Sequence, residues 1–477
     1  MLVAKRRGSG LVVVSILTAL AAGACGGGDD ADQGAAGGDT RADVANECPV
    51  GALDALPDSE KPVEITFWHT QLSSNEDVLK AIIKRFHASQ DDVRVKLVQS
   101  PGERETLAKY KAGLESGDLP DILELEDTVV QTMVDSHSTV TMQDCVDADH
   151  YDTSDFLQQT LDFYSTEGLL RAMPWNVSHP ILIYNRVAFE AAGLDPDEPP
   201  TTTDEIREYS KKIVESGAAK HGIALRTQNW LTEFFYALSG QPYVNNGDGR
   251  DKRATKALLD NETGLAIWKW WDEMVDSGLA LDTGSQDGNF DNLIAIGTGQ
   301  AAMTLDGSPV LGPVFDVLAS GQYKGVDIGA GPFPGLTEGG GVPVSDGAVW
   351  ISDRSTPAKR AAAWELVKFL SSPEEQAALA VGTGTIPTRR SSAEVPELRD
   401  LWRRRPAFRV AYDQLVDSPR NDATIGPVIG DYQGVRDAVR DGLTAMLDAG
   451  KSPAEALKQA QRDADVAIAE YNARVGG

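Results

Sequence analysis

The chain has 477 residues, of which 41% are hydrophobic, and it carries a formal net charge of −28 at pH 7. This length exceeds what one hydrophobic core usually organises, so we expect two domains. The negative charge argues against a nucleic-acid partner, because a polyanion would be repelled instead of gaining affinity through counterion release.

The N-terminal region predicts export. Lys5-Arg6-Arg7 precedes an apolar run over residues 11–22 that is too short to span a bilayer comfortably, which is typical of a signal peptide over residues 1–24. The segment Ala22-Gly23-Ala24-Cys25 resembles the bacterial lipobox, although Ala22 stands where Leu is usual. That resemblance implies cleavage before Cys25 and a diacylglycerol on its sulfur. An ordinary secretory signal with an incidental cysteine is the alternative.

The segment behind Cys25 is rich in Gly, Ala and Asp as far as residue 45, and it predicts a flexible tether. We therefore expect an extracytoplasmic protein, lipid-anchored to the outer face of the cell membrane. Cys48 and Cys145 remain, and an oxidising compartment favours a disulfide between them, with two free buried thiols as the alternative.

From residue 63 the pattern predicts a βαβαβ unit. Alternating apolar residues over 63–67 predict a strand, Ser73 and Glu76 suggest a capping box for the next helix, and strands are expected over 93–98 and 121–125. A helix is expected over 103–116. Such a unit forms a parallel sheet with right-handed crossovers.

Ligands of open α/β sheets bind beyond the carboxyl ends of the strands. That rule singles out His69 and Gln71 after the first strand, and Glu126 and Asp127 after the third. Trp68 precedes them and fits the core equally well.

A second α/β unit follows. Thr202 and Glu205 predict a capping box, and a strand over 221–225 places Asn229 and Trp230 at a carboxyl end. A further strand over 301–305 ends at Asp306-Gly307.

The Gly- and Pro-rich region 329–347 predicts a loop, with a strand over 348–351 after it. Three helices are expected to finish the chain, opening near Ser355, Ser372 and Ser452.

Motifs of catalysis and metal binding are missing. The six histidines have no metal-ligand spacing, and no GxSxG, P-loop or GxGxxG motif occurs. A glycosidase pair of carboxylates can come from anywhere in a sequence with 72 acidic residues, so an extracellular glycoside hydrolase stays an alternative.

Several phrases occur in a specific order: ITFWH, LPDILEL, MPWNVSHPILIYN, GQAAMTLDGS, GAVWIS, AWELVKFLSSPEEQA and GTGTIPTRR. In this order they resemble the extracellular solute-binding proteins of ABC importers, the family that includes maltose-binding and glycerol-3-phosphate-binding proteins. The resemblance covers residues 62–475. It implies a periplasmic-binding-protein-like α/β fold, with two α/β lobes, a ligand cleft between them and hinge crossings. The first lobe would hold residues 46–174 and 306–353, and the second 178–303 and 354–477.

The resemblance also implies a function. It predicts a substrate-binding lipoprotein of an ABC importer, which is not an enzyme and needs no cofactor or metal, and which delivers its solute to the transmembrane subunits of a permease. A monomer is expected, with no nucleic-acid partner. A mono- or oligosaccharide is the expected ligand, because carboxylates and amides bind hydroxyls and an indole stacks on a sugar ring.

The expected ligand-binding residues come from two sources, the strand-end rule and the family resemblance. They are His69, Gln71, Glu126, Asp127, Asn176, Ser178, Asn229, Trp230, Asp306 and Gly347. Four of them, Glu126, Ser178, Trp230 and Gly347, match contact positions of the glycerol-3-phosphate branch. Residues 176–178 are also where we expect the chain to cross first between the lobes.

The phosphate-binding features of that branch are incomplete. It would use an aromatic residue near Thr385 and an arginine within 421–434, and neither is present. Without a guanidinium a phosphate dianion is poorly held, although Arg389 or Arg420 could substitute. Glycerol 3-phosphate or a glycerophosphodiester is therefore the alternative ligand.

Overall fold

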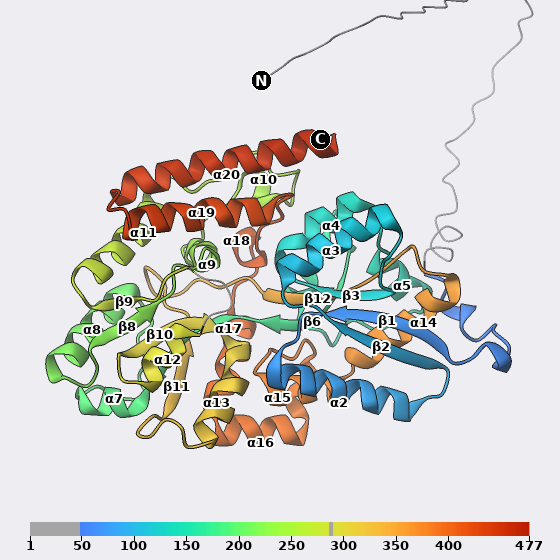
Figure 1. The fold of residues 1–477 in the computed structure, drawn as a ribbon, viewed down its shortest axis with the longest axis horizontal. Helices are drawn as coiled ribbons and strands as arrows, with labels where there is room; N and C mark the ends of the chain where they lie inside the picture. Colours follow the sequence, from blue (N-terminus) through green and yellow to red (C-terminus); the bar gives the residue numbers. More distant parts are fainter. Residues whose placement is uncertain (1–47, 286–289, 477) are drawn as a thin grey trace, which may run out of the picture. The chain divides into compact units, whose positions relative to one another are not determined.

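The computed structural model describes residues 48–285 and 290–476, and two five-stranded sheets with flanking helices organise them (Figure 1). The expected signal peptide over 1–24, the lipidated Cys25 and the tether to residue 45 fall outside the described residues.

The strands and helices follow one another along the whole described chain. The strands are β1 (Val63–His69), β2 (Val93–Gln99), β3 (Ile122–Leu125), β4 (Ser165–Thr166), β5 (Leu169–Leu170), β6 (Met173–Ser178), β7 (Pro180–Asn185), β8 (His221–Leu225), β9 (Ala280–Asp282), β10 (Ala301–Gly307), β11 (Ile328–Pro332) and β12 (Ser345–Ile351). The α-helices are α2 (Ser73–Ser89), α3 (Glu103–Ser116), α4 (Val130–Ser136), α5 (Met142–Ala148), α6 (Gln158–Phe163), α7 (Arg186–Ala191), α8 (Thr203–Ser216), α9 (Trp230–Leu238), α10 (Asn245–Asp248), α11 (Glu262–Asp276), α12 (Asp291–Gly297), α13 (Leu311–Ala319), α14 (Pro357–Leu370), α15 (Pro373–Thr383), α16 (Pro396–Arg404), α17 (Val410–Asp417), α18 (Asp422–Ile425), α19 (Tyr432–Leu447) and α20 (Pro453–Val475). Short 3₁₀ turns include η1 (Val50–Ala52), η3 (Asp127–Val129) and η4 (Ser308–Val310).

The first sheet has the strand order β2-β1-β3-β12-β6. Strand β1 pairs in parallel with both β2 and β3, which confirms the predicted βαβαβ unit. Helix α3 ends as predicted, because Gly117 takes the left-handed conformation that closes a helix. The predicted capping box at Ser73 is wrong: α2 begins at Ser73 itself, Leu72 stands at the N-cap, and no side chain caps the turn.

The second sheet has the order β11-β7-β10-β8-β9. Strand β8 is parallel to β10 and β9, whereas β7 is antiparallel to β10 and β11. Helix α8 precedes β8, and its capping box is confirmed: the Thr202 hydroxyl accepts from the Glu205 amide while the Glu205 carboxylate accepts from the backbone of Thr202. One hydrophobic cluster surrounds the first sheet and extends to Ile181, Ile183 and Ile328 of the second, and another packs on the second sheet. The chain therefore forms two α/β lobes, each built on one sheet.

Strand β11 corrects the prediction of a continuous loop over 329–347. Its glycines are required by close packing: a Cβ on Gly329 would lie 2.4 Å from the Tyr184 ring, and one on Gly331 would lie 2.8 Å from Pro199. Pro332 is tolerated because β11 is an edge strand. The glycine and proline content of this segment therefore predicted a loop where the structure has a strand.

The chain crosses between the sheets at His179. Strand β6 ends in the first sheet at Ser178, and β7 begins in the second sheet at Pro180. The expected crossing at 176–178 is thus displaced by one residue, and these three residues pair in the first sheet. The His179 ring is buried, which lowers its pKa to about 3, and its Nδ1 lies 3.0 Å from Nε2 of Gln414.

Two segments differ from the expected lobe bounds. Strand β11, expected in the first lobe, pairs with β7 in the second sheet. Helices α14 and α15, expected in the second lobe, pack against β1 and α2 of the first. Polar contacts explain this docking: Trp364 and Lys368 both donate to Asp149 at 2.8 Å, and Arg85 pairs with Glu375 at 2.5 Å.

A disulfide joins Cys48 to Cys145, so the expected bond is present. It ties the beginning of the described chain to α5, 97 residues later. Turn η1, which follows Cys48, also packs against α14.

The C-terminal helices α19 and α20 pack along each other and on α11 (Figure 1). The apolar face predicted for α20 is confirmed, since Leu457, Ala460, Ala464, Ile468 and Tyr471 are all buried. Within 48–285 and 290–476 no helix is long and apolar enough to cross a membrane.

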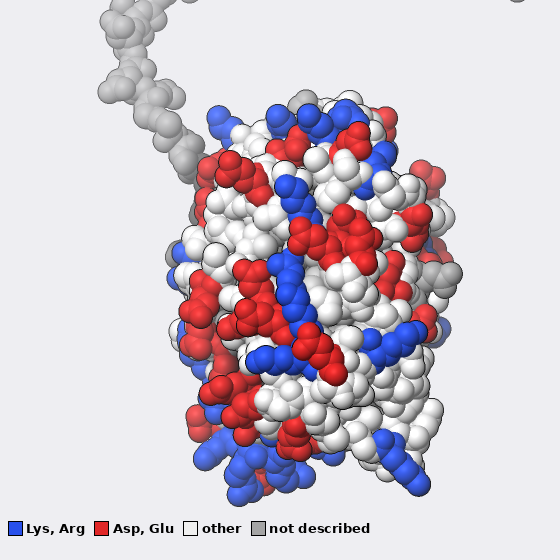
Figure 2. All heavy atoms as spheres, turned by 90° about the vertical axis from the view of Figure 1, so that its left-hand side faces the viewer, with Lys and Arg blue, Asp and Glu red and all other residues white. Residues whose placement is uncertain are grey.

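The charged side chains of one face of the molecule are mixed in sign. Figure 2 shows acidic and basic residues interspersed among uncharged ones, with Lys and Arg gathered at the lower end, where α16 lies in Figure 1. The net charge of −28 is therefore not segregated into a single acidic field on this face.

Candidate functional site

Polar residues converge at one edge of the first sheet. The carboxyl ends of β1, β3 and β6 lie there beside the beginning of β12, because Ala348 pairs with Leu125 and Ser345 pairs with Ser178. The strand-end rule predicted this edge from the sequence. It also lies at the crossing into the second lobe, so groups of both lobes can reach a ligand there.

Glu124 holds this edge together. One of its carboxylate oxygens accepts from Nε2 of Gln71 at 2.6 Å and from Nδ2 of Asn176 at 3.0 Å, and the other accepts from the backbone amide of Thr70 at 3.2 Å. Burial raises the pKa of Glu124 to about 7, against the effect of these hydrogen bonds. Gly347 makes room for the carboxylate, since a Cβ there would lie 3.2 Å from its Oε1.

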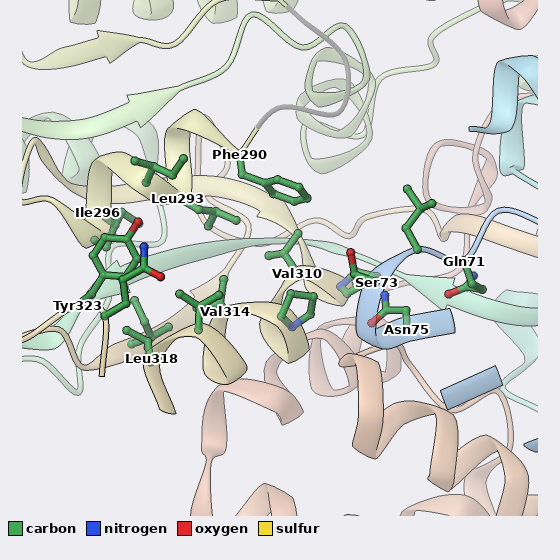
Figure 3. A pocket seen from close by; sticks show the side chains of 18 of the residues that line it. Gln71, Ser73, Asn75, Phe290, Leu293, Ile296, Val310, Val314, Leu318 and Tyr323 are labelled. Carbon is green, nitrogen blue, oxygen red and sulfur yellow. The ribbon is translucent and has the colours of Figure 1, made fainter. Parts of the chain in front are cut away.

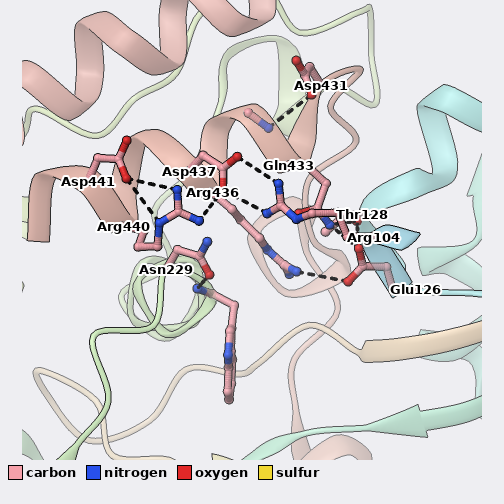
Figure 4. A network of polar contacts seen from close by, with 12 residues as sticks. Arg104, Glu126, Thr128, Asn229, Asp431, Gln433, Arg436, Asp437, Arg440 and Asp441 are labelled. Atoms are coloured by element: carbon pink, nitrogen blue, oxygen red, sulfur yellow. Dashed lines mark hydrogen bonds and ion pairs between the residues drawn. The ribbon is translucent and has the colours of Figure 1, made fainter. Parts of the chain in front are cut away.

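Arg436 of α19 is the central cation. Its guanidinium lies 2.6 Å from Glu233 and 3.1 Å from Asp127. A longer ion pair of 3.6 Å joins it to Glu126 (Figure 4). All four side chains are buried. Burial raises the pKa of Asp127 to about 8, with Arg436 opposing the rise and neighbouring carboxylates adding to it.

Two further acids face the same cluster. Glu103, at the start of α3, has a pKa raised well above its usual value by burial and by the neighbouring Glu126. Burial raises the pKa of Asp346 to about 6, although a hydrogen bond from Ser178 opposes the rise. Asp346 has a left-handed backbone (φ 67°) just before Gly347. The cluster around Arg436 is therefore rich in carboxylates, and the Arg436 guanidinium is already paired.

Helix α19 connects this cluster to the first lobe. Gln433 donates to both Glu126 and Thr128, and Arg104 of α3 forms two hydrogen bonds with Asp437 at 2.9 and 3.0 Å (Figure 4). Because α19 packs in the second hydrophobic cluster, these bonds join the lobes beside the site.

A cavity of about 510 Å³ opens next to the cluster. One end is polar, and Gln71, Ser73 and Asn75 lie there, whereas apolar side chains of α12 and α13 line the other end (Figure 3). Asn176 and Asp346 complete the polar end. Asn75 and Asn176 both line the cavity, and within residues 48–285 and 290–476 their Oδ1 atoms are buried without a hydrogen-bond partner.

The predicted ligand-binding residues fall into three groups. Gln71 and Asn176 line the cavity, whereas Glu126 and Asp127 form the cluster around Arg436. Ser178 and Gly347 lie between them, beside Asp346 and Glu124.

The remaining predicted residues lie apart from these contacts. His69 is buried with its ring edge against Phe67, and neither of its nitrogens has a hydrogen-bond partner in the described part of the chain. Asn229 caps α9, and Trp230 packs edge-on against Phe234 with ring centroids 5.6 Å apart. Asp306 accepts from Asn292 at 2.8 Å inside the second lobe. Their contact with a ligand stays a prediction.

The proposed substitutes for a phosphate-binding arginine are engaged elsewhere. Arg389 donates to the carbonyl of Ser371 and to the hydroxyl of Tyr151, each at 2.5 Å, and Arg420 pairs with Asp162 at 2.5 Å.

Sequence reasoning missed Arg436, which lies two residues beyond the stretch 421–434. Its position beside the buried Val435 and Val439 on α19 was the available signal, because a charged residue on an apolar helix face needs buried partners.

Among the described residues, no group of three or more His, Cys, Asp or Glu is placed to hold a metal ion. The cluster is instead neutralised in part by Arg436.

The family model of the bacterial extracellular solute-binding proteins matches residues 81–409. The chain belongs to this family. Members of the family bind solutes, which agrees with the expectation that the chain is not an enzyme.

Two curated relatives of this solute-binding protein are named for binding sn-glycerol 3-phosphate. The sn-glycerol-3-phosphate-binding periplasmic protein of Pectobacterium atrosepticum is 25% identical over 411 residues, covering 84% of this chain and 90% of the relative. The protein of the same name from Yersinia pestis is 27% identical over 419 residues, covering 86% and 93%.

Solved structures share the fold. The GacH receptor of Streptomyces glaucescens, studied unliganded and with acarbose, matches with a TM-score of 0.70 and 22% identity over 86% of this chain and 99% of that chain. UgpB of Mycobacterium tuberculosis in complex with glycerophosphocholine matches with a TM-score of 0.71 and 20% identity over 86% and 99%. Similar folds therefore hold ligands of two chemical classes.

Proposed function

We propose that this solute-binding protein captures a mono- or oligosaccharide between its lobes and delivers it to the permease of an ABC importer. One observation carries the proposal: the site offers buried carboxylates and unpartnered amide oxygens, while its buried guanidinium, that of Arg436, is already paired. Because carboxylate and amide oxygens accept hydrogen bonds, such a site favours a ligand that donates them.

Sugar hydroxyls meet that requirement. Each hydroxyl donates one hydrogen bond, and the cavity is lined by Asp346 and by Asn75 and Asn176, whose Oδ1 atoms have no donor among the residues that the structure describes. A buried acceptor without a donor costs free energy, so a hydroxyl placed there gains more than it would in water. We further propose that Trp230 turns toward the bound sugar and stacks on its ring.

A glycerophosphodiester is the second candidate. Arg436 favours it, because this guanidinium lies among the predicted site residues where sequence reasoning expected none. The names of the curated relatives point the same way. A phosphate at Arg436 would nevertheless lie among Glu126, Asp127 and Glu233, so like charges would oppose it. We therefore place it second.

The proposal includes the cell location. We propose that cleavage before Cys25 and lipidation of its sulfur anchor the protein to the outer face of the cell membrane, with residues 25–45 as a tether. The two lobes would close on the solute by a hinge at His179 and at the connection between β11 and β12.

A thermal-shift panel tests the function. A ligand that binds only the folded state raises the melting temperature, so one class among neutral sugars, glycerol 3-phosphate and glycerophosphocholine should stand out. We expect a neutral sugar to produce the largest shift. A larger shift with either phosphate compound would favour the second candidate, and cleavage of a polysaccharide would favour the hydrolase alternative.

A pair of matched variants tests whether the ligand-induced rise in melting temperature depends on this site. Glu126→Gln removes a charge beside Arg436, whereas Glu375→Gln removes an equally buried carboxylate that pairs with Arg85 elsewhere in the first lobe. We expect Glu126→Gln to reduce the sugar-induced shift and Glu375→Gln to leave it unchanged. Equal shifts in the two variants would contradict the assigned site.

A further inference from the structure

Exposed apolar side chains gather at one place beside the polar site. Ten large apolar side chains are exposed in the described residues, and four of them line the cavity. These four are Leu72, Phe290, Ile294 and Val317, with exposed fractions of 51, 55, 46 and 42%. Soluble proteins rarely leave such a group uncovered without a binding role.

The apolar wall of the cavity has a defined construction. Leu293 of α12 and Val310 of η4 face Val314 and Leu318 of α13 across the cavity (Figure 3). These four side chains are partly buried and pack against the hydrophobic cluster that surrounds the first sheet, which holds the wall in place. The wall is therefore part of the packed structure and not a loose surface.

The apolar wall and the polar end belong to the same cavity. Gln71 and Asn75 lie at the opposite end from Leu318 and Tyr323 (Figure 3). A volume of about 510 Å³ lies within the range of roughly 300–1,000 Å³ that is usual for one small ligand. A single molecule can therefore contact both ends.

We infer that the apolar end is a subsite for a hydrophobic substituent, an alkyl or aryl aglycone, on a solute whose hydroxyls bind at Asn75, Asn176 and Asp346. This inference rests on the proposed function and specifies its ligand class as a glycoside. Continuity with the polar end selects this occupant, because Gln71, Asn176 and Asp346 line the same cavity as the apolar wall, and amide and carboxylate groups bind hydroxyls.

The first experiment uses the neutral apolar fluorophore N-phenyl-1-naphthylamine, which brightens in apolar surroundings. Val317→Asp places a charge in the apolar end, and Val416→Asp places the same charge on α17 at a valine of similar exposure, 39% against 42%. Both positions are exposed, so both variants should fold. We expect saturable binding by the wild type and by Val416→Asp, and at least tenfold weaker binding by Val317→Asp.

The second experiment uses methyl, butyl and hexyl glycosides of whichever sugar the thermal-shift panel identifies. Each methylene that enters the apolar end should raise the affinity about fourfold, as transfer of a CH₂ group from water predicts. The Val317→Asp variant should lose this dependence on chain length and still bind the free sugar.

Several results would overturn the inference. Equal fluorophore binding by Val317→Asp and Val416→Asp would do so, and so would equal affinities along the alkyl series while the free sugar binds, which would leave the proposed function standing. Sedimentation showing a dimer that Val317→Asp dissociates would assign the wall to a second copy of the chain. If no carbohydrate binds but the fluorophore still distinguishes the two variants, the proposed function fails and the apolar subsite remains.

Discussion

Arg436 determines the electrostatics of the site at the scale of single residues. Three buried carboxylates share its guanidinium, and its Cζ lies 5.0 Å from the centroid of the Tyr432 ring. A buried charge that loses its partner is far more costly than an exposed one. Arg436 is thus required for the carboxylates to remain together, whatever ligand they bind.

Replacing Arg436 with Met should lower the free energy of unfolding by about 3–5 kcal/mol, because Glu126, Asp127 and Glu233 would remain buried without a cation. Urea denaturation measures the loss. Arg440→Met is the matched control on the same helix, since Arg440 pairs with the more exposed Asp437 and Asp441, and about 1 kcal/mol or less is expected there. Similar losses in both variants would show that the cluster is not the source.

Gly347 is required by the Glu124 carboxylate. An added methyl group would lie 3.2 Å from Oε1 of Glu124, a carboxylate that three hydrogen bonds hold in place. We therefore expect Gly347→Ala to lower the free energy of unfolding by about 1–3 kcal/mol and to weaken solute binding. Gly51→Ala is the control, because open space surrounds that position. Tolerance of alanine at both glycines would contradict the tight packing.

At the scale of elements, periodic segments were predictable and tertiary contacts were not. The βαβαβ unit, the α8 capping box and the buried face of α20 follow from local patterns that agree with the fold. Strand β11 was missed because Gly329 and Gly331 suit a loop by composition, yet here they admit Tyr184 and Pro199. Composition does not report the side chains that pack against a backbone.

The candidate site was predictable to a similar degree. The strand-end rule placed Gln71, Glu126 and Asp127 at one edge, because that rule depends only on topology. Asp346 lay in the region taken for a loop, and Arg436 comes from a helix 309 residues away from Asp127. Long-range pairs of this kind depend on how the lobes meet, which local sequence patterns do not specify.

The disulfide attaches the first described residues to α5. Because it closes a segment of 97 residues, its removal should increase the entropy of the unfolded chain substantially. We expect the double variant Cys48→Ala and Cys145→Ala to lose about 4 kcal/mol of unfolding free energy relative to the oxidised protein. Denaturation of the wild type with and without reductant provides the comparison. No effect of reductant would show that the bond contributes nothing to stability.

At the scale of the whole molecule, buried carboxylates couple stability to pH. Burial raises the folded-state pKa of Asp127 to about 8 and of Glu124 to about 7, so these groups retain protons that the unfolded chain releases. Their stabilising contribution is complete below the unfolded pKa and is lost as pH rises through the folded value. The buried His179 has a lowered pKa, so its contribution to stability increases as pH rises, but only below about pH 6.5.

As pH rises from about 6.5 to 8, the melting temperature of the ligand-free protein should therefore fall. Each carboxyl group contributes a slope of at most about 1.4 kcal/mol per pH unit. Asp127→Asn removes one of these titrations and should flatten the dependence, as thermal denaturation over this range would show. Asp413→Asn is the control, because Asp413 pairs with Arg409 at a half-exposed position on α17, and it should leave the slope unaltered. An unchanged slope in Asp127→Asn would contradict the proposed protonation of the cluster.

We expect the carboxylate- and amide-rich site to bind a neutral, hydroxyl-bearing solute. Isothermal titration calorimetry at pH 7 measures this binding, with the sugar identified by the thermal-shift panel titrated into the wild type and into Asp346→Asn, since Asp346 lines the cavity. We expect one-to-one binding that excess glycerol 3-phosphate does not displace, and an affinity at least about tenfold weaker in the variant, as loss of a hydrogen bond to a charged group implies. Tight binding of glycerol 3-phosphate that excludes the sugar would contradict it.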